Sequence, residues 1–160
     1  MSFQLPPRRG ERPVTGHTIP HLQHTQKSPN SIREALKAWA LCTLPDVREE
    51  DTRVSIHSTR AFWLAEEVEA RRADAFMPPA GGREFAHLHA DGSLHLCVSD
   101  EAVQEIASSG WGEPHPLRDR GVNEVLFYAP RDAAELDFAK RALGESYRYA
   151  TGRAVPAEEN

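Results

Sequence analysis

The chain has 160 residues, 39% of them hydrophobic, and a formal net charge of −5, which fits one domain with a buried core but hardly two. The negative charge, and the lack of aromatic side chains among the basic ones, exclude a typical nucleic-acid-binding protein. No apolar run approaches the roughly 20 residues that span a bilayer, and residues 1–10 contain no signal-peptide hydrophobic region, so we expect a cytoplasmic protein without a membrane partner. The two cysteines, Cys42 and Cys97, form no C-x-x-C pair, which is typical of a reducing compartment.

The chain begins with a segment, residues 1–30, that is rich in proline and arginine and has no apolar periodicity. This composition predicts an extended arm that either wraps the domain or stays mobile. Residues 31–152 are expected to form the folded domain, and residues 153–160 a polar tail.

The first predicted helix begins at Ser31, where Glu34 three residues later completes a capping box, and it should end before Pro45. Residues 53–64 have strand character with a polar interruption, which fits either one bent strand or a tight hairpin. The charged residues 65–75 are consistent with either a short helix or a loop.

A β-hairpin over residues 83–98 is the clearest element, because two strand-like runs flank Asp91-Gly92. After it, Ser99 is expected to cap a helix that stops at Gly110. Residues 123–129 predict a further strand.

The last predicted helix opens at Asp132, with Glu135 as its reciprocal capping partner, and ends at Gly152. This order of elements predicts an α+β fold, with a small, largely antiparallel sheet that has the histidine-bearing hairpin at its centre and packs against about three helices.

The turn decides where the hairpin histidines point. A two-residue turn would leave His95 on the face opposite to His87 and His89, whereas a three-residue turn with Gly92 in the left-handed bulge position pairs His87 with His95. The second register separates the side chains cleanly, because Phe85, the three histidines and Cys97 then share one face and the aliphatic residues line the other. We therefore predict the second register.

Three histidines on adjacent strands are a spacing that can hold Zn²⁺ or Fe²⁺. Further ligands could come from Glu84, Glu113 and His115. The alternative is that the imidazoles act as bases or hydrogen-bond donors in a pocket without metal, and the sequence favours this alternative. A thiol nucleophile at Cys97 is a formal alternative, but nothing visibly lowers its pKa.

Other catalytic motifs are missing. The chain has no G-x-S-x-G elbow and no phosphate-binding loop, so serine and nucleotide hydrolases are poor guesses. Residues 110–117 place Trp111, Glu113 and His115 between glycines and prolines, which predicts a rigid loop of the kind that often carries sites.

Five motifs together resemble the luciferases of bioluminescent fungi and their soluble bacterial relatives. They are REFAHLH at residues 83–89, LHL at 94–96, GWG with HPL at 110–117, YAPR at 128–131 and YAT at 149–151. Weaker similarity extends to the arm and to His57, so the resemblance covers nearly the whole chain.

The resemblance implies an oxygenase that acts on a small enolisable aromatic or α-pyrone substrate of the 3-hydroxyhispidin type, with O₂ and without an organic cofactor. Such a reaction needs a base for the enol proton, donors for the developing anion and apolar walls. Carried onto this chain, it gives the catalytic candidates His87, His89, His95, His115 and Glu84, and the substrate-binding candidates His57, Trp111, Tyr128 and Arg131.

The chain departs from the family pattern in three places, one of which is its hairpin turn, which is slightly longer in the fungal enzymes. The fungal enzymes have an N-terminal hydrophobic membrane segment without a counterpart here, and alanine commonly stands in the place of Cys97, which argues against a thiol mechanism. The resemblance does not imply light emission. The alternative function is that of a non-catalytic domain of the same fold that binds a small molecule or a metal ion.

Overall fold

A computed structural model describes residues 2–158 and contains three α-helices and a six-stranded open sheet. The strand order is β1-β2-β3-β4-β6-β5, and every neighbouring pair is antiparallel, which confirms the predicted α+β fold. The helices are α1 (Asn30–Thr43), α2 (Asp100–Ser108) and α3 (Ala133–Thr151), and the strands are β1 (Val47–Asp51), β2 (Arg60–Leu64), β3 (Glu84–Leu88), β4 (Leu94–Leu96), β5 (Gly112–Pro114) and β6 (Val125–Phe127).

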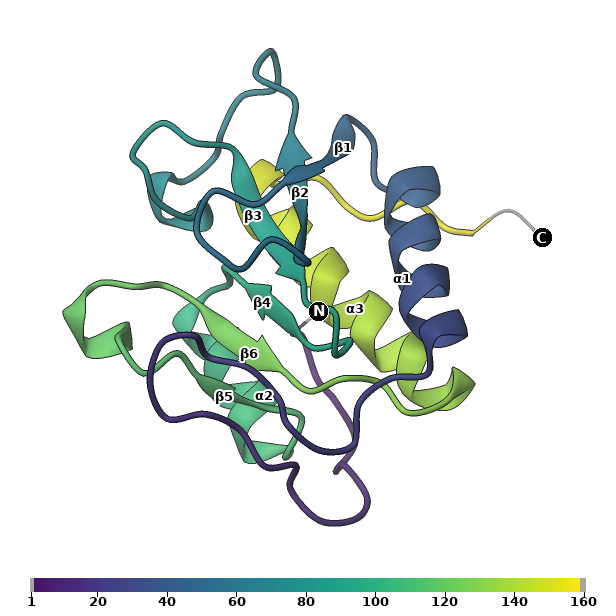
Figure 1. Ribbon diagram of the computed structural model, residues 1–160. Coiled ribbons are helices and arrows are strands. Elements are labelled where there is room, and N and C mark those ends of the chain that lie inside the picture. Colours follow the sequence, from purple (N-terminus) through teal and green to yellow (C-terminus); the bar gives the residue numbers. More distant parts are fainter. Residues whose placement is uncertain (1, 159–160) are drawn as a thin grey trace.

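One face of the sheet is covered by helices. Helix α3 packs against β3 and β4, α1 packs against α3, and α2 packs against β5. Figure 1 shows α2 and α3 behind the sheet and α1 to its right. The aliphatic side chains of the hairpin point to this side, where Leu88, Leu94 and Leu96 are fully buried. Burial of each such side chain stabilises the fold by about 1.5–3 kcal/mol. Within residues 2–158 no helix has the length and apolar character needed to cross a membrane.

The N-terminal arm wraps the domain, which is one of the two behaviours expected of it. In Figure 1 it runs across β6 and β5 as the purple segment. Trp111 Nε1 donates to the carbonyl of Pro6 at 2.6 Å, and Gln23 Oε1 accepts from the backbone N–H of Ala129 at 2.8 Å. The domain boundary at residue 30 stays a prediction, and Met1 and residues 159–160 of the predicted arm and tail lie outside the described residues.

The predicted hairpin register is confirmed. His87 pairs with His95, and His89 N–H donates to the carbonyl of Ser93 at 2.9 Å. Gly92 has φ +95° and donates to the carbonyl of His89 at 3.0 Å, so the turn has three residues and a glycine in the left-handed region. The histidines therefore project away from the helices.

The predicted face of Phe85 is wrong because of a β-bulge. Phe62 pairs with Ala86 and the adjacent Trp63 pairs with Glu84, so Phe85 is an extra residue in β3. The bulge turns Phe85 into the core, where its ring lies 6.3 Å from that of Tyr147. It also brings Glu84 to the histidine face.

The predicted strand at residues 53–64 is correct only in its second half. Val54 and Ile56 are exposed in the loop between β1 and β2. The partner strand β1 has the sequence VREED, which the sequence reading missed because charged side chains at a sheet edge hide the apolar alternation. Residues 110–117 were predicted to form a rigid loop, but residues 112–114 form the short strand β5. The strand was not recognised because two of its three residues, Gly112 and Pro114, are rare in strands.

The ends of the helices agree with the sequence in most places. Ser99 and Asp132 cap α2 and α3 through their side chains, and α1 ends before Pro45. The capping box predicted at Ser31 is wrong, because Pro29 is the N-cap of α1 and Glu34 pairs with Arg33 and Lys37 instead.

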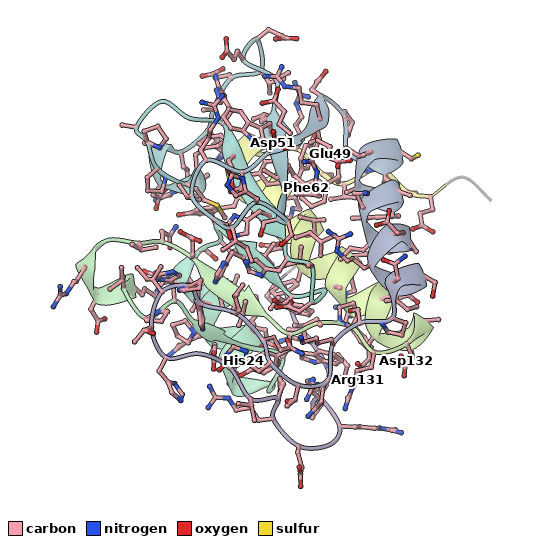
Figure 2. All side chains as sticks on the ribbon, in the orientation of Figure 1. His24, Glu49, Asp51, Phe62, Arg131 and Asp132 are labelled. Carbon is pink, nitrogen blue, oxygen red and sulfur yellow. The ribbon has the colours of Figure 1, made fainter. Side chains whose placement is uncertain are left out.

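At the start of α3, Glu135 reaches back to the backbone N–H of Arg131 rather than to that of Asp132. The Arg131 guanidinium also pairs with the Glu135 carboxylate at 2.5 Å, and Figure 2 shows Arg131 beside Asp132 at this helix end. Burial alone would raise the pKa of Glu135, but the hydrogen bonds from Arg131 lower it overall.

Glu135→Gln is expected to destabilise the protein at neutral pH and to lose this effect in acid. A carboxyl whose folded-state pKa is lowered contributes stability above its unfolded-state pKa, and this contribution is lost as the pH falls through the folded-state value. Urea unfolding at pH 7 and at about pH 3 measures the difference. Asp137→Asn, at an exposed position of the same helix, is the control, and an equal loss for Glu135→Gln at both pH values would contradict the assignment.

Candidate active site

A row of side chains crosses the sheet on the face opposite to the helices. The register places Ala61, His87, His95, Leu126 and Glu113 side by side on β2, β3, β4, β6 and β5. Residues paired in this way point to the same face of a sheet. The sheet therefore carries two histidines and a carboxylate across its middle.

A continuous chain of hydrogen-bonding contacts joins this row to the arm. Glu113 Oε1 lies 2.8 Å from His21 Nε2, and His21 Nδ1 lies 3.0 Å from His95 Nε2. The other nitrogen of His95, Nδ1, lies 3.0 Å from His87 Nε2, and His87 Nδ1 lies 2.8 Å from Glu84 Oε2. Three buried imidazoles thus connect two buried carboxylates.

Both carboxylates are held by further donors. Glu84 accepts from Thr52 Oγ1 at 2.9 Å and from the backbone N–H of Arg53 at 3.0 Å. Glu113 pairs with the Arg12 guanidinium and accepts from the Tyr128 hydroxyl at 3.2 Å. Because these partners are all donors, the carboxylates at both ends of the chain of contacts are acceptors.

His89 stands beside the chain of contacts. Its Nδ1 lies 2.9 Å from Ser93 Oγ, and this hydroxyl donates to Asp91 Oδ1 at 2.5 Å. Within residues 2–158 the other nitrogen, Nε2, is buried and has no hydrogen-bond partner. The His89 ring lies 4.9 Å from that of His87 and 4.7 Å from that of His95.

Burial keeps most of these imidazoles neutral. Desolvation lowers the pKa of His21 to about 4, with neighbouring His115 and His17 as further causes. Desolvation also lowers the pKa values of His89 and His95 well below the ordinary value, and adjacent histidines add to the effect. A neutral imidazole has one N–H donor and one lone pair, so the directions of the hydrogen bonds decide which nitrogens are free.

A cavity of about 370 Å³ opens beside the row. Its polar wall has four histidines and Glu124, and its apolar wall comes from the arm, the loop between β1 and β2, and the segment before β6. The lining residues are Ile19, Pro20, His21, Val54, Ser55, Ile56, Pro78, His87, His95, His115, Leu117, Val122 and Glu124.

Two of the lining residues, His115 and Glu124, carry groups that can donate or accept a proton. His115 Nδ1 accepts from the backbone N–H of Leu117 at 3.1 Å, so in the neutral ring Nε2 carries the proton and can donate it. The Glu124 carboxylate lies 3.8 Å from His95 Nδ1. Burial raises the pKa of Glu124, as is common for a carboxyl that acts as a base.

The structure brings five of the nine predicted site residues together. His87, His89, His95 and Glu84 form the cluster, and His115 lines the cavity next to it. The predicted substrate-binding residues do not line this cavity.

Each of these four substrate-binding candidates has another place in the structure. His57 is exposed in the loop between β1 and β2. Trp111 stacks on Phe127 on the helix side of the sheet, with ring centroids 5.9 Å apart. Arg131 pairs with Glu135. Tyr128 donates to Glu113 at the end of the cluster. Their proposed contact with substrate stays a prediction.

Sequence reasoning missed two residues of the site. His21 lies in the arm, 74 positions from His95, and no local pattern marks it. Glu124 was detectable, because it lies two positions before Leu126, which pairs with His95, and alternation along the strand places it on the same face.

Taken together, the fold and the cluster define a small α+β domain with a cavity and a buried imidazole–carboxylate site on its sheet. The luciferase domain model matches residues 82–146, which include the hairpin, β5, β6 and most of α3. The motifs had predicted this resemblance, and it is confirmed: the chain is similar in sequence to the fungal luciferases.

The similarity extends beyond the matched domain. The chain is 31% identical over 166 residues to the luciferase of Armillaria gallica and 29% identical over 165 residues to that of Armillaria mellea, in both cases over 92% of this chain and 61% of the relative. The luciferase of Neonothopanus nambi is 34% identical over 76 residues, which are 43% of this chain and 28% of that protein. The chain thus spans less than two thirds of the length of these relatives. No solved structure matches it.

Proposed function

We propose that the protein is a luciferase-like oxygenase that acts on a small enolisable aromatic or α-pyrone substrate of the 3-hydroxyhispidin type, with O₂ and without an organic cofactor. The observation that carries this proposal is the cavity, which has apolar residues on one wall and His87, His95, His115 and Glu124 on the other. Its volume of about 370 Å³ falls in the range of pockets for small organic ligands, roughly 300–1,000 Å³.

The polar wall supplies the two functions that the reaction requires. Glu124 takes the enol proton, because it lines the cavity and its carboxylate is not within hydrogen-bonding distance of His95 Nδ1. His115 Nε2–H donates to the oxygen anion that this proton transfer creates. The electron-rich enolate can then react with O₂.

The apolar wall keeps water from this anion. Ile19 and Pro20 reach the cavity from the arm, and Val54 and Ile56 reach it from the loop between β1 and β2. Without a substrate, the side chains of Val54 and Ile56 are 40% and 41% exposed. A bound aromatic substrate would cover them, which accounts for apolar side chains at an otherwise polar surface.

Oxygen consumption tests the proposal. Purified protein with 3-hydroxyhispidin in an oxygen electrode is expected to consume O₂ in proportion to the substrate that disappears, and a luminometer records whether light accompanies it. The same assay with the hispidin analogue that lacks the 3-hydroxyl group is the matched control, because the ring is much less readily oxidised by O₂ without this group. No protein-dependent O₂ uptake with the hydroxylated substrate would overturn the proposal.

The second candidate, a non-catalytic domain that binds a metal ion or a small molecule, has an observation of its own. The buried Nε2 of His89 has no partner among residues 2–158, which a proton acceptor at Glu124 does not explain.

A further inference from the structure

The hydrogen bonds of the cluster leave two lone pairs face to face. The carboxylates of Glu84 and Glu113 only accept, so His87 Nδ1 and His21 Nε2 are the donors at the two ends of the chain of contacts. Neutral His21 then accepts at Nδ1, and His95 donates to it from Nε2. His87 Nε2 and His95 Nδ1, 3.0 Å apart, both remain unprotonated. Two lone pairs at this distance repel each other unless a cation lies between them.

His89 has a further lone pair, and its ring lies 4.9 Å from that of His87 and 4.7 Å from that of His95. The Ser93 hydroxyl donates to Asp91 and therefore accepts from His89 Nδ1, so Nε2 is unprotonated. This nitrogen is buried, and no group in residues 2–158 donates to it. One nitrogen of each of His87, His89 and His95 lies within 4.8 Å of the other two.

A proton and a metal ion differ in what they satisfy. An additional proton on His87 Nε2 would satisfy the contact with His95 but would leave His89 Nε2 buried without a partner, which costs about 1–3 kcal/mol. A metal ion accepts all three lone pairs at once. We infer that His87, His89 and His95 bind one divalent transition-metal ion.

The chemistry of the donors selects the kind of ion. Imidazole nitrogens suit Zn²⁺, Fe²⁺ and Co²⁺, whereas Mg²⁺ and Ca²⁺ prefer oxygen ligands. Nitrogens bound to Zn²⁺ at about 2.0–2.1 Å stand roughly 3.3 Å apart in a tetrahedron. His87 Nε2 and His95 Nδ1 already have a similar separation, at 3.0 Å.

Each of the three imidazoles has its outer nitrogen fixed. Glu84 holds His87, Ser93 with Asp91 holds His89, and His21 with Glu113 holds His95. Metal-binding histidines generally have such partners, which set the tautomer and the orientation of the ring. The negative charges of Glu84 and Glu113 also compensate part of the charge of the ion.

A second group of histidines is a weaker candidate. His21, His95 and His115 also offer nitrogens within 4.8 Å of one another. However, His115 Nδ1 accepts from the backbone N–H of Leu117, so Nε2 carries the ring proton and has no lone pair for an ion. The hairpin triad is therefore the site.

The position of the site relates it to the cavity. His87 and His95 line the cavity, and Glu124 lies 3.8 Å from His95 Nδ1 on the same side. The sequence alone named these three histidines as the metal set but favoured a pocket without metal, and the lone pairs reverse that preference. The inference goes beyond the proposed oxygenase activity and does not depend on it.

Metal content tests the inference without any turnover. Protein without a polyhistidine tag is dialysed against a chelator and then against Zn²⁺, Co²⁺ or, under anaerobic conditions, Fe²⁺, with Mg²⁺ as the comparison ion. Mass spectrometry of the metals is expected to find about one transition-metal ion per chain and no Mg²⁺. Bound Co²⁺ should also give visible absorption bands that report nitrogen coordination.

Four variants locate the ion. His89→Ala removes a ligand and should abolish stoichiometric binding, and Ser93→Ala keeps the ligand but frees its ring, so we expect an affinity about 10–100-fold lower. His115→Ala and His24→Ala should bind as the wild type does. If His89→Ala fails to fold, as judged by circular dichroism, Ser93→Ala decides.

Three outcomes would overturn the inference. They are a folded wild type that takes up none of the three transition metals, full retention of the ion by both His89→Ala and Ser93→Ala, and loss of the ion from His115→Ala. Oxygen uptake is measured separately, so a protein that binds the ion but does not consume O₂ would refute the proposed function alone.

Discussion

Glu124→Gln should lower O₂-dependent turnover by roughly 10²–10⁴-fold, the usual contribution of a general base. Glutamine has nearly the same size and keeps the buried position, but its amide cannot take the enol proton. Glu124 lines the cavity, and burial raises the pKa of its carboxyl group, so it is better matched to proton transfer near neutral pH than an ordinary glutamate. Initial rates in an oxygen electrode at saturating substrate measure the loss of kcat.

His24→Ala is the matched control for this variant. His24 is exposed on the arm and is labelled in Figure 2, and its loss should leave turnover unchanged. Glu124→Gln should also keep the metal content of the wild type, because the ion is assigned to the hairpin triad. Wild-type kcat in Glu124→Gln would refute the base assignment, and loss of the ion would make Glu124 a ligand instead.

Gly92→Ala is expected to have a large effect on stability and should lower the free energy of unfolding by at least about 2 kcal/mol. Gly92 has φ +95°, a conformation that costs about 1–3 kcal/mol for other residues. A Cβ atom at this position would also overlap the Ser28 side chain. Ser28 Oγ donates to the carbonyl of Pro130 at 2.5 Å, so the overlap would disturb the junction between arm and turn. Urea unfolding measures the change.

Gly81→Ala separates the two causes. Gly81 has φ +82°, and a Cβ there would meet no atom within 4 Å, so only the backbone cost applies. We expect Gly92→Ala to be clearly more destabilising than Gly81→Ala. The double variant Gly92→Ala/Ser28→Gly should recover part of this difference, because it removes the overlapping side chain. Equal losses at the two glycines would show that the contact with Ser28 has no energetic weight.

The sequence was most informative where local pattern and local chemistry agree. The hairpin register followed from the alternation of histidines and aliphatic residues and from Gly92 in the turn, and the structure has the same pairing of His87 with His95. The caps at Ser99 and Asp132 were recognised for the same reason, since each uses a contact within three residues.

The sequence was least informative where distant segments decide. The bulge opposite Phe62 and Trp63 exchanged the faces of Phe85 and Glu84, because its position depends on the pairing with β2. The contact of His21 with His95 joins the arm to β4, and no periodicity in either segment predicts it. The sequence of the hairpin therefore predicted the inner histidines of the cluster, but it did not predict His21 from the arm.

Because His21 belongs to the arm and His95 to β4, the site is formed by two segments. The arm can separate from the sheet more easily than the domain can unfold. Residues 2–30 have few large buried side chains, and hydrogen bonds such as those of Trp111 to Pro6 and Ala129 to Gln23 hold this arm on the domain. Local opening of such a segment requires less free energy than global unfolding. Release of the arm would open the outer end of the cluster while the hairpin triad stays on the sheet, so exchange of a bound ion or substrate should follow the opening rate of the arm rather than the unfolding rate of the protein.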